Sequence, residues 1–249
     1  MRQKFIKGLK NHTMISNLQL SADGANNFKL LDRYCKDAGI SIFKACPVKA
    51  VAGSFHPSLN ENPYTARMTA AISMAFHLSD AVLEGIFDRP TPHYAMHYNR
   101  INSFLDDTAL RVTAIIQNSG YNAMPVPASQ IIDKSSQRGY LNHKIVAAAA
   151  GAGFIGRNNL LVTPQFGSRV RLVSVLTDAP LEFTEPLEDG CGDCFACLAS
   201  CPAQAIKESP ENFELAKCIE QISRFQRLMF VAKGICGVCV KACAGRKNK

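Results

Sequence analysis

Eight of the ten cysteines in this 249-residue chain lie close together near its C-terminal end. They fall between residues 191 and 243, whereas the preceding part of the chain contains only Cys35 and Cys46. A disulfide framework is typical of a short secreted domain, but a chain of this length with 47% hydrophobic residues can bury a core without cross-links. The clustering therefore indicates metal-binding thiolates, and we interpret Cys35 and Cys46 as inert buried thiols.

The first four clustered cysteines follow the C-x2-C-x2-C-x3-C-P spacing of bacterial two-cluster ferredoxins, with Pro202 in the last position. In such proteins three of the four thiolates bind one 4Fe-4S cluster and the fourth binds the neighbouring cluster. This rule predicts one cluster held by Cys191, Cys194, Cys197 and Cys243 and a second held by Cys201, Cys218, Cys236 and Cys239. A zinc ribbon would use two CxxC pairs and leave ligands over. Ala244 departs from the pattern, because a second ferredoxin half usually has proline there.

A plain electron carrier with two clusters needs only roughly the last sixty residues. The much longer region before the cysteines therefore favours an enzyme, and a carrier with a docking domain remains the alternative. A linker with Pro180, Pro186 and several acidic residues precedes the first clustered cysteine. We place a boundary there, between a mixed α/β domain (1–185) and a ferredoxin-like domain (186–249).

The hydrophobic pattern of the larger region predicts an α/β (α+β) fold with a mixed sheet. Apolar residues with a helical period predict helices at 27–36 and 99–117. β-Branched and apolar runs predict strands at 70–76 and 121–126, and a hairpin formed by 160–163 and 170–177.

The formal charge of +8 and the pI near 9.0 suit either RNA or an acidic electron donor as a partner. The densest positive charge lies from Lys241 to Lys249, where a solvated tail without a specific role is equally consistent. The start of the sequence has no secretory or twin-arginine signal, and no apolar run is long enough for a membrane span. We therefore expect a cytoplasmic protein with no membrane partner.

Gly151, Gly153 and Gly156 stand in G-x-G-x-x-G order. A dinucleotide-binding motif of this form lies between a strand and a helix. Here an alanine-rich helix precedes the glycines and a hairpin follows them, so the context argues against NAD.

The same residues carry a resemblance to a known family. The runs AGAGFIGRNNLLVTPQFGSRVRLVSVLTDAPL, CGDCFACLASCPAQAI, KCIEQ and CGVCVKAC resemble epoxyqueuosine reductases and, more distantly, reductive dehalogenases. The chain looks like a short form without the C-terminal helical-repeat extension. The resemblance implies a cobalamin, bound base-off in the larger domain, that receives electrons from the clusters and reduces the substrate. It also implies a low-potential electron donor such as ferredoxin or flavodoxin, and tRNA as a partner.

The resemblance also suggests which residues contact the corrinoid. No Asp-x-His-x-x-Gly motif for base-on binding occurs. Glycines in the motif and in the following turn would allow a large flat cofactor to approach the backbone, although simple packing of the helix against the hairpin is the alternative. The candidate corrinoid-binding residues are Gly151, Gly153, Gly156, Arg157, Phe166, Gly167, Ser168 and Arg169.

The family's aspartate acid is missing from its expected position, which falls near Gln137. The candidate proton donors are Asp133, Tyr140 and His143. Phe154 and Arg157 also replace the usual Trp and Lys. These departures suggest a paralogue with a different substrate.

His93 and His97 are four residues apart and can share one face of a helix. Paired histidines can bind metal, but no third ligand is evident, so we expect them at a surface or a pocket wall.

Overall fold

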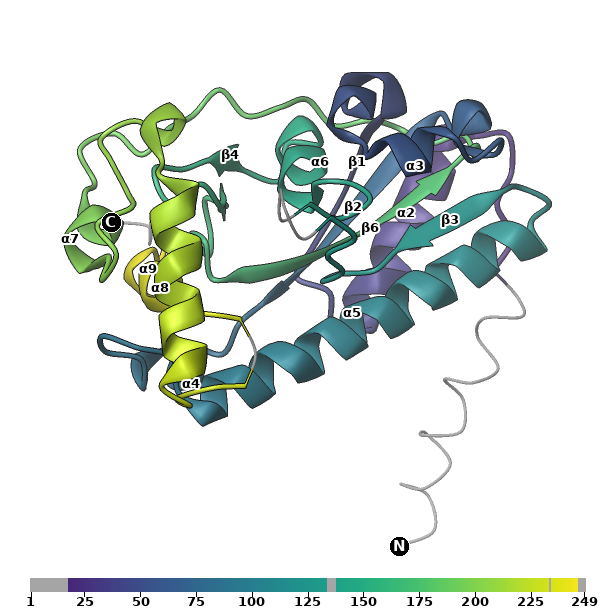
Figure 1. Cartoon of the computed structure of the whole chain (residues 1–249). Helices are drawn as coiled ribbons and strands as arrows, with labels where there is room; N and C mark the ends of the chain where they lie inside the picture. The colour runs from purple at the N-terminus through teal and green to yellow at the C-terminus, as the bar shows by residue number, and fades with distance from the viewer. Residues whose placement is uncertain (1–17, 134–137, 233, 246–249) are drawn as a thin grey trace, which may run out of the picture.

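A four-stranded sheet forms the centre of the computed structural model, which describes residues 18–133, 138–232 and 234–245 (Figure 1). The strand order is β1-β2-β6-β3, and each neighbouring pair is antiparallel. A separate hairpin joins β4 to β5. The strands are β1 (Ile42–Pro47), β2 (Ala70–His77), β3 (Ala123–Val126), β4 (Phe154–Ile155), β5 (Leu161–Val162) and β6 (Val170–Thr177).

Helices cover both faces of the sheet, because alternate side chains of the inner strands point to opposite sides. Ile72 and Met74 of β2 pack with α2 and α5 on one face, whereas Ala71 packs with α6 on the other. The α-helices are α2 (Gly24–Asp37), α3 (Pro57–Asn60), α4 (Asp80–Glu84), α5 (Pro92–Asn118), α6 (His143–Ala149), α7 (Ala196–Ser200), α8 (Leu215–Arg227) and α9 (Val238–Ala242). Short 3-10 turns are η2 (Val48–Ala50), η3 (Ala52–Ser54), η4 (Thr65–Arg67) and η5 (Pro210–Asn212).

Local sequence signals set the ends of the two long helices of the larger part. Asp23 caps α2 by accepting hydrogen bonds from two backbone amides, and Thr91 caps α5 by accepting one from the amide of Tyr94. Gly39 and Gly120 follow these helices with positive φ angles of 102° and 87°, which glycine adopts without strain. The predicted helices and the strands at 70–76 and 121–126 are thus confirmed, and α5 begins seven residues earlier than predicted.

The α+β class is confirmed, but two details of the predicted sheet are wrong. The four-stranded sheet is antiparallel rather than mixed. The predicted hairpin between 160–163 and 170–177 does not form, because β6 lies between β2 and β3 and both of its edges are occupied. Instead, β5 turns back onto β4 through Asn159, whose φ is 57°.

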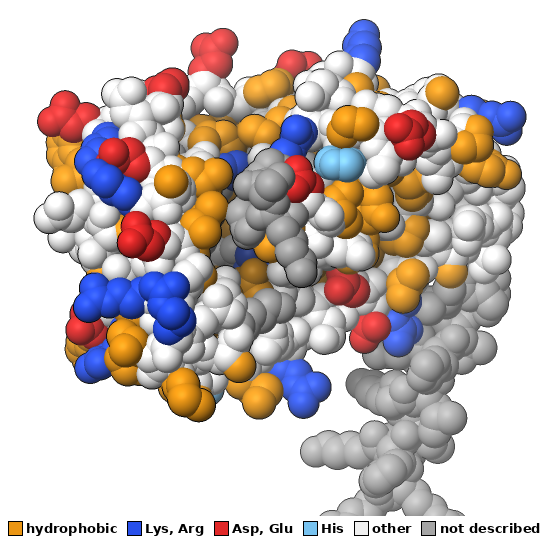
Figure 2. Space-filling model, viewed as in Figure 1, with side chains coloured by type: hydrophobic (Ala, Val, Ile, Leu, Met, Phe, Trp, Pro, Cys, Tyr) orange, Lys and Arg blue, Asp and Glu red, His pale blue; other side chains and the backbone are white. Residues whose placement is uncertain are grey.

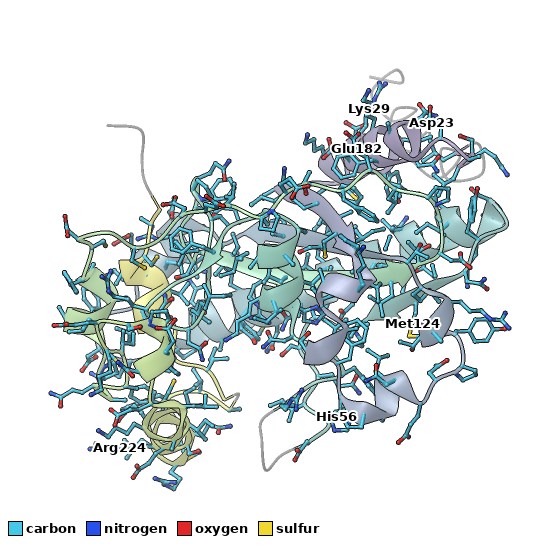
Figure 3. All side chains as sticks on the ribbon, turned by 90° about the horizontal axis from the view of Figure 1, so that it is seen from above. Asp23, Lys29, His56, Met124, Glu182 and Arg224 are labelled. Atoms are coloured by element: carbon cyan, nitrogen blue, oxygen red, sulfur yellow. The ribbon has the colours of Figure 1, made fainter. Side chains whose placement is uncertain are left out.

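The segment with the clustered cysteines lies at one end of the sheet, where α7, α8 and α9 gather (Figures 1 and 3). It shares core contacts with the larger part, since Val231, Ile235 and Val238 pack in the same hydrophobic cluster as α5. Lys241 donates hydrogen bonds to the carbonyl oxygens of Glu84 and Ile86, at 3.2 and 2.7 Å. The boundary at 185/186 stays a prediction. None of the helices in the described ranges combines the length and hydrophobicity that a bilayer span requires.

Candidate functional site

The fold brings the clustered cysteines into two groups of four. The Cys197 thiol interacts electrostatically with the thiols of Cys191, Cys194 and Cys243, where α7 packs against α9. Burial, followed by these neighbours, raises the pKa of Cys197 to about 11. We call these four residues the first thiol group. Cys194 is its exposed member.

The second thiol group contains Cys201, Cys218, Cys236 and Cys239. Burial and then its three partners raise the pKa of Cys239, and burial is also the main reason why the pKa of Cys236 rises to about 11. Helix α8 supplies Cys218 to this group from outside the two CxxC-type motifs. The grouping equals the predicted crossed pattern, while cluster binding itself stays a prediction. Among the described residues, no three His, Cys, Asp or Glu side chains form a site for a single metal ion.

A cavity of about 880 Å³ separates the second thiol group from the sheet and α6. Cys201, Cys218, Cys236 and Cys239 all line its wall, together with residues from α5, α6, β6, α8 and the β4–β5 hairpin. The volume lies near the upper end of the range for ligand pockets in proteins. The cavity is therefore large enough for an extended ligand that touches both parts of the chain.

Few of the candidate corrinoid-binding residues reach this cavity. Ser168 lines it, and its hydroxyl accepts a hydrogen bond from Asn158, another lining residue, at 3.0 Å. The other candidates in this set do not line it: Gly151, Gly153, Gly156, Arg157, Phe166, Gly167 and Arg169.

The glycines instead allow the chain to approach itself. A Cβ at Gly151 would overlap the carbonyl oxygen of Glu185, and one at Gly153 would overlap that of Val162. Gly156 lies beside the Val162 side chain and the Cys191 sulfur. Close packing, the alternative raised for these glycines, therefore accounts for the need for glycine at these positions, and their contact with a corrinoid stays a prediction.

Arg157 and Arg169 fasten the thiol-bearing segment to the larger part. Arg157 donates hydrogen bonds to the carbonyl oxygens of Gly192, Cys194 and Glu208, at 2.9, 3.0 and 2.5 Å. Arg169, with only 10% of its side chain exposed, forms an ion pair with Asp80 at 2.5 Å and also donates to the carbonyl oxygen of Lys241. Arg157 thus ties together three backbone positions of the thiol-bearing segment, and removing the Arg169 guanidinium would leave partly buried groups unpaired, so both residues have a structural task.

The three candidate proton donors differ in position. Tyr140 and His143 line the cavity, whereas Asp133 does not and pairs through its backbone with Arg138. Gln137, the position expected for the family's aspartate, lies outside the described residues.

Both ring nitrogens of His143 are already engaged. Nε2 lies 2.9 Å from the carbonyl oxygen of Pro127, and Nδ1 lies 2.9 Å from the hydroxyl of the buried Ser174. A carbonyl only accepts, so Nε2 carries the proton and Nδ1 accepts from Ser174. Burial lowers the pKa of His143 to about 4. A neutral, doubly bonded imidazole is suited to holding α6 in place and poorly suited to donating a proton.

This assignment gives a pH prediction. Because the folded chain holds His143 neutral with a pKa of about 4, against 6.5 when unperturbed, acid favours the unfolded chain between these values. We expect the unfolding free energy of the wild type to fall by about 2–3 kcal/mol more than that of His143→Gln between pH 7 and pH 4. Urea titrations across this range measure the difference. The exposed control His93→Gln should follow the wild type, and parallel curves for His143→Gln would contradict the assignment.

Two cavity residues had no signal in the sequence. The Lys144 ammonium donates to the backbone and side-chain oxygens of Asn159, both at 2.6 Å, and burial lowers its pKa to about 8. Arg171 donates to Asn102 at 3.0 Å and stacks over the Tyr98 ring at 4.1 Å. Only the alternation along β6 hinted that Arg171 points away from the α6 face of the sheet.

His93 and His97 lie on α5, as their spacing suggested. Nε2 of His97 accepts a hydrogen bond from the Ser79 amide at 3.0 Å, and burial lowers the His97 pKa. His97 therefore ties α5 to the start of α4. Cys35 and Cys46 are fully buried, and burial raises the pKa of both thiols.

The fold of this chain is similar to the folds of a reductive dehalogenase and of an epoxyqueuosine reductase. A reductive dehalogenase, whose structure suggests a mechanism for B12-dependent dehalogenation, superposes with a TM-score of 0.70 at 20% identity. The match covers 93% of this chain and 35% of the dehalogenase. The epoxyqueuosine reductase of Streptococcus thermophilus superposes with a TM-score of 0.60 at 20% identity, covering 87% of this chain and 65% of that one.

In sequence, the chain resembles the epoxyqueuosine reductases, as its motifs predicted. A stretch of 86 residues is 37% identical to the epoxyqueuosine reductase of Bacillus subtilis (strain 168). It covers 34% of this chain and 22% of that relative, so the match spans less than a quarter of the curated protein. No family model matches the chain.

Proposed function

We propose that this protein is a cobalamin-dependent iron-sulfur reductase in which two 4Fe-4S clusters deliver electrons to a corrinoid and its substrate in the 880 Å³ cavity. The observation that carries the proposal is that all four thiols of the second group line this cavity. A redox centre held there would share a wall with whatever the cavity binds.

The arrangement of the thiol groups supports an order of electron flow. The first group includes the exposed Cys194, so it faces a partner in solution. The second group lies between the first group and the cavity, and Cys239 interacts electrostatically with Cys197 across the two groups. Electrons from a low-potential donor such as ferredoxin or flavodoxin would enter at the first group and leave at the second.

The chemistry of the cavity wall supports a corrinoid as the ligand. Its walls combine apolar side chains such as Leu161 and Leu172 with neutral polar groups such as Ser168 and Asn158. A reduced corrinoid supplies a strong cobalt nucleophile that forms at low potential. The chain's own residues would orient the substrate and exclude water. Tyr140 and Lys144 are the lining residues best placed to supply a proton, since His143 has no nitrogen free of a partner.

The substrate and the place of action are also proposals. An epoxyqueuosine reductase has been solved with an epoxyqueuosine-modified tRNA stem loop, and an RNA partner would suit the +8 charge of this chain. Lys and Arg side chains gather over α8, including Arg224, which points outward (Figures 2 and 3). We propose that the substrate is a tRNA or a smaller molecule of related chemistry. We also propose that the protein acts in a reducing compartment such as the cytoplasm.

Anaerobic reconstitution with iron and sulfide, followed by titration with hydroxocobalamin, tests the function. The wild type should bind the corrinoid at micromolar concentration with a base-off spectrum. Ser129→Trp, which fills part of the cavity, should weaken binding by about tenfold or more. Ser103→Trp adds the same bulk to an exposed site on α5 and should bind as the wild type does. Full cluster content without corrinoid binding would refute the enzyme and favour an electron carrier.

A further inference from the structure

The charge of the cavity wall is strongly one-sided. Arg138, Lys144 and Arg171 line the cavity, and no Asp or Glu occurs among its described lining residues. Arg138 is exposed, whereas Lys144 and Arg171 are partly buried. A low-dielectric wall strengthens the attraction of such cations for an anion.

Lys144 is held by neutral oxygens rather than by a carboxylate. Two of its three N–H groups donate to the backbone oxygen and the Oδ1 atom of Asn159. No ion pair to Lys144 occurs within the described part of the chain. One donor of the ammonium is therefore available to a ligand.

Among the residues that the structure describes, Arg171 has no carboxylate partner, in contrast to Arg169 two positions earlier in the sequence. Arg169 is neutralised by Asp80 and Glu84, at 2.5 and 3.4 Å. Arg171 instead contacts neutral groups, namely Asn102 at 3.0 Å, the carbonyl oxygen of Ala128 at 3.3 Å and the Tyr98 ring. A partly buried charge is costly without a counter-charge, so Arg171 is prepared for a partner from outside the chain.

Asn102 holds the Arg171 guanidinium from behind the cavity wall, because Asn102 itself does not line the cavity. Its side chain is 6% exposed, and its Oδ1 atom accepts from Arg171. Its Nδ2 group is buried with no hydrogen-bond partner. Unsatisfied buried donors are rare in native proteins, and here the donor belongs to the residue that positions the Arg171 guanidinium.

We propose that the cavity binds an oxyanion, a carboxylate or a phosphate, through the cations Lys144 and Arg171 of its wall. The identity of the anion rests on the proposed function. The oxyanion would be either the nucleotide-loop phosphate of the corrinoid or an acidic group of the substrate. The planar guanidinium would bind two oxygens of the anion, and the ammonium would bind one.

Binding measurements on the cluster-loaded protein separate the two sources. The probes are hydroxocobalamin, cobinamide (which lacks the phosphate), inorganic phosphate, benzoate and its neutral analogue benzamide. Lys144→Gln and Arg171→Gln are compared with Lys29→Gln and Arg33→Gln, which remove exposed charges from α2. Loss of one charge-assisted contact should weaken binding by about tenfold or more.

If the anion is the corrinoid phosphate, both cavity variants bind hydroxocobalamin more weakly and bind cobinamide normally. If it belongs to the substrate, both corrinoids bind normally, but benzoate and phosphate lose affinity for the variants. Unchanged binding of every probe overturns the proposal. Equal binding of benzoate and benzamide also overturns it when the cavity variants bind hydroxocobalamin as the wild type does. Circular dichroism checks that each variant is folded. If Arg171→Gln does not fold, Lys144→Gln alone tests the proposal.

The anion measurements are also made without corrinoid. Suppose that the protein binds phosphate or benzoate in a way that depends on Lys144 but does not bind hydroxocobalamin. This result would support the oxyanion site and contradict the proposed corrinoid function.

Discussion

Replacing Cys201 by serine is expected to halve the iron content and to remove the cluster of the second thiol group, although Cys201 belongs by sequence to the first motif. In the fold its thiol neighbours are Cys218, Cys236 and Cys239. A cubane needs four ligands, and a cluster with one weak ligand is lost readily. Iron and sulfide analysis after anaerobic reconstitution measures the loss.

Paired substitutions show which cluster has gone, using iron content alone. Adding Cys218→Ser to Cys201→Ser should cost no further iron, because both residues serve the same cluster. Adding Cys191→Ser should remove the remaining half. Cys35→Ala, which changes a buried thiol outside both groups, should keep the full iron content. The crossed assignment would be wrong if the double variant Cys201→Ser/Cys218→Ser lost all of its iron while Cys201→Ser/Cys191→Ser lost only half.

Gly167→Ala is expected to be strongly destabilising and to damage the first thiol group. Gly167 has a φ of 58°, and a Cβ there would overlap the carbonyl oxygen of Cys243 and the amide of Gly245. The left-handed backbone costs alanine about 1–2 kcal/mol, and the overlap adds about 1–3 kcal/mol. The strain falls on the hydrogen bond from the Ser168 amide to Cys243, so the first thiol group should open.

The expected result is an unfolding free energy lower by about 2–5 kcal/mol and preferential loss of the first cluster. Chemical denaturation measures the former, and iron release to a chelator over time measures the latter. Gly53→Ala, where a Cβ meets nothing within 4 Å, is the matched control and should change neither. Wild-type iron retention in Gly167→Ala would show that the contact at Cys243 does not support the cluster.

The cysteine pattern predicted which thiols the fold brings together, because its information is local, while the binding of clusters by these thiols stays a prediction. Gaps of two residues determine how far apart the thiols of Cys191, Cys194 and Cys197 can lie, and the x3 gap before Pro202 sends Cys201 elsewhere. The end of α5 before Gly120 was predictable for the same reason, whereas the start of this helix after the Thr91 cap was not recognised.

Long-range pairing was not predictable in this way. The run 170–177 has the composition of a strand, but its partners β2 and β3 lie far away in the sequence. Nothing near β6 distinguishes these partners from the adjacent residues 160–163. The cavity residues were missed for a similar reason, since Lys144 and Arg171 gain their meaning only from neighbours that the fold brings to them.

The interleaving of the two thiol groups also governs when each cluster can be completed as the chain is synthesised. The first group waits for Cys243 and the second for Cys239, even though half of the ligands lie at or before Cys201. A ribosome that stopped between residues 201 and 236 would release a product unable to hold either cluster with four thiolates. Under the crossed assignment, neither predicted cluster can therefore gain all four of its thiolates before the chain has been made as far as Cys239.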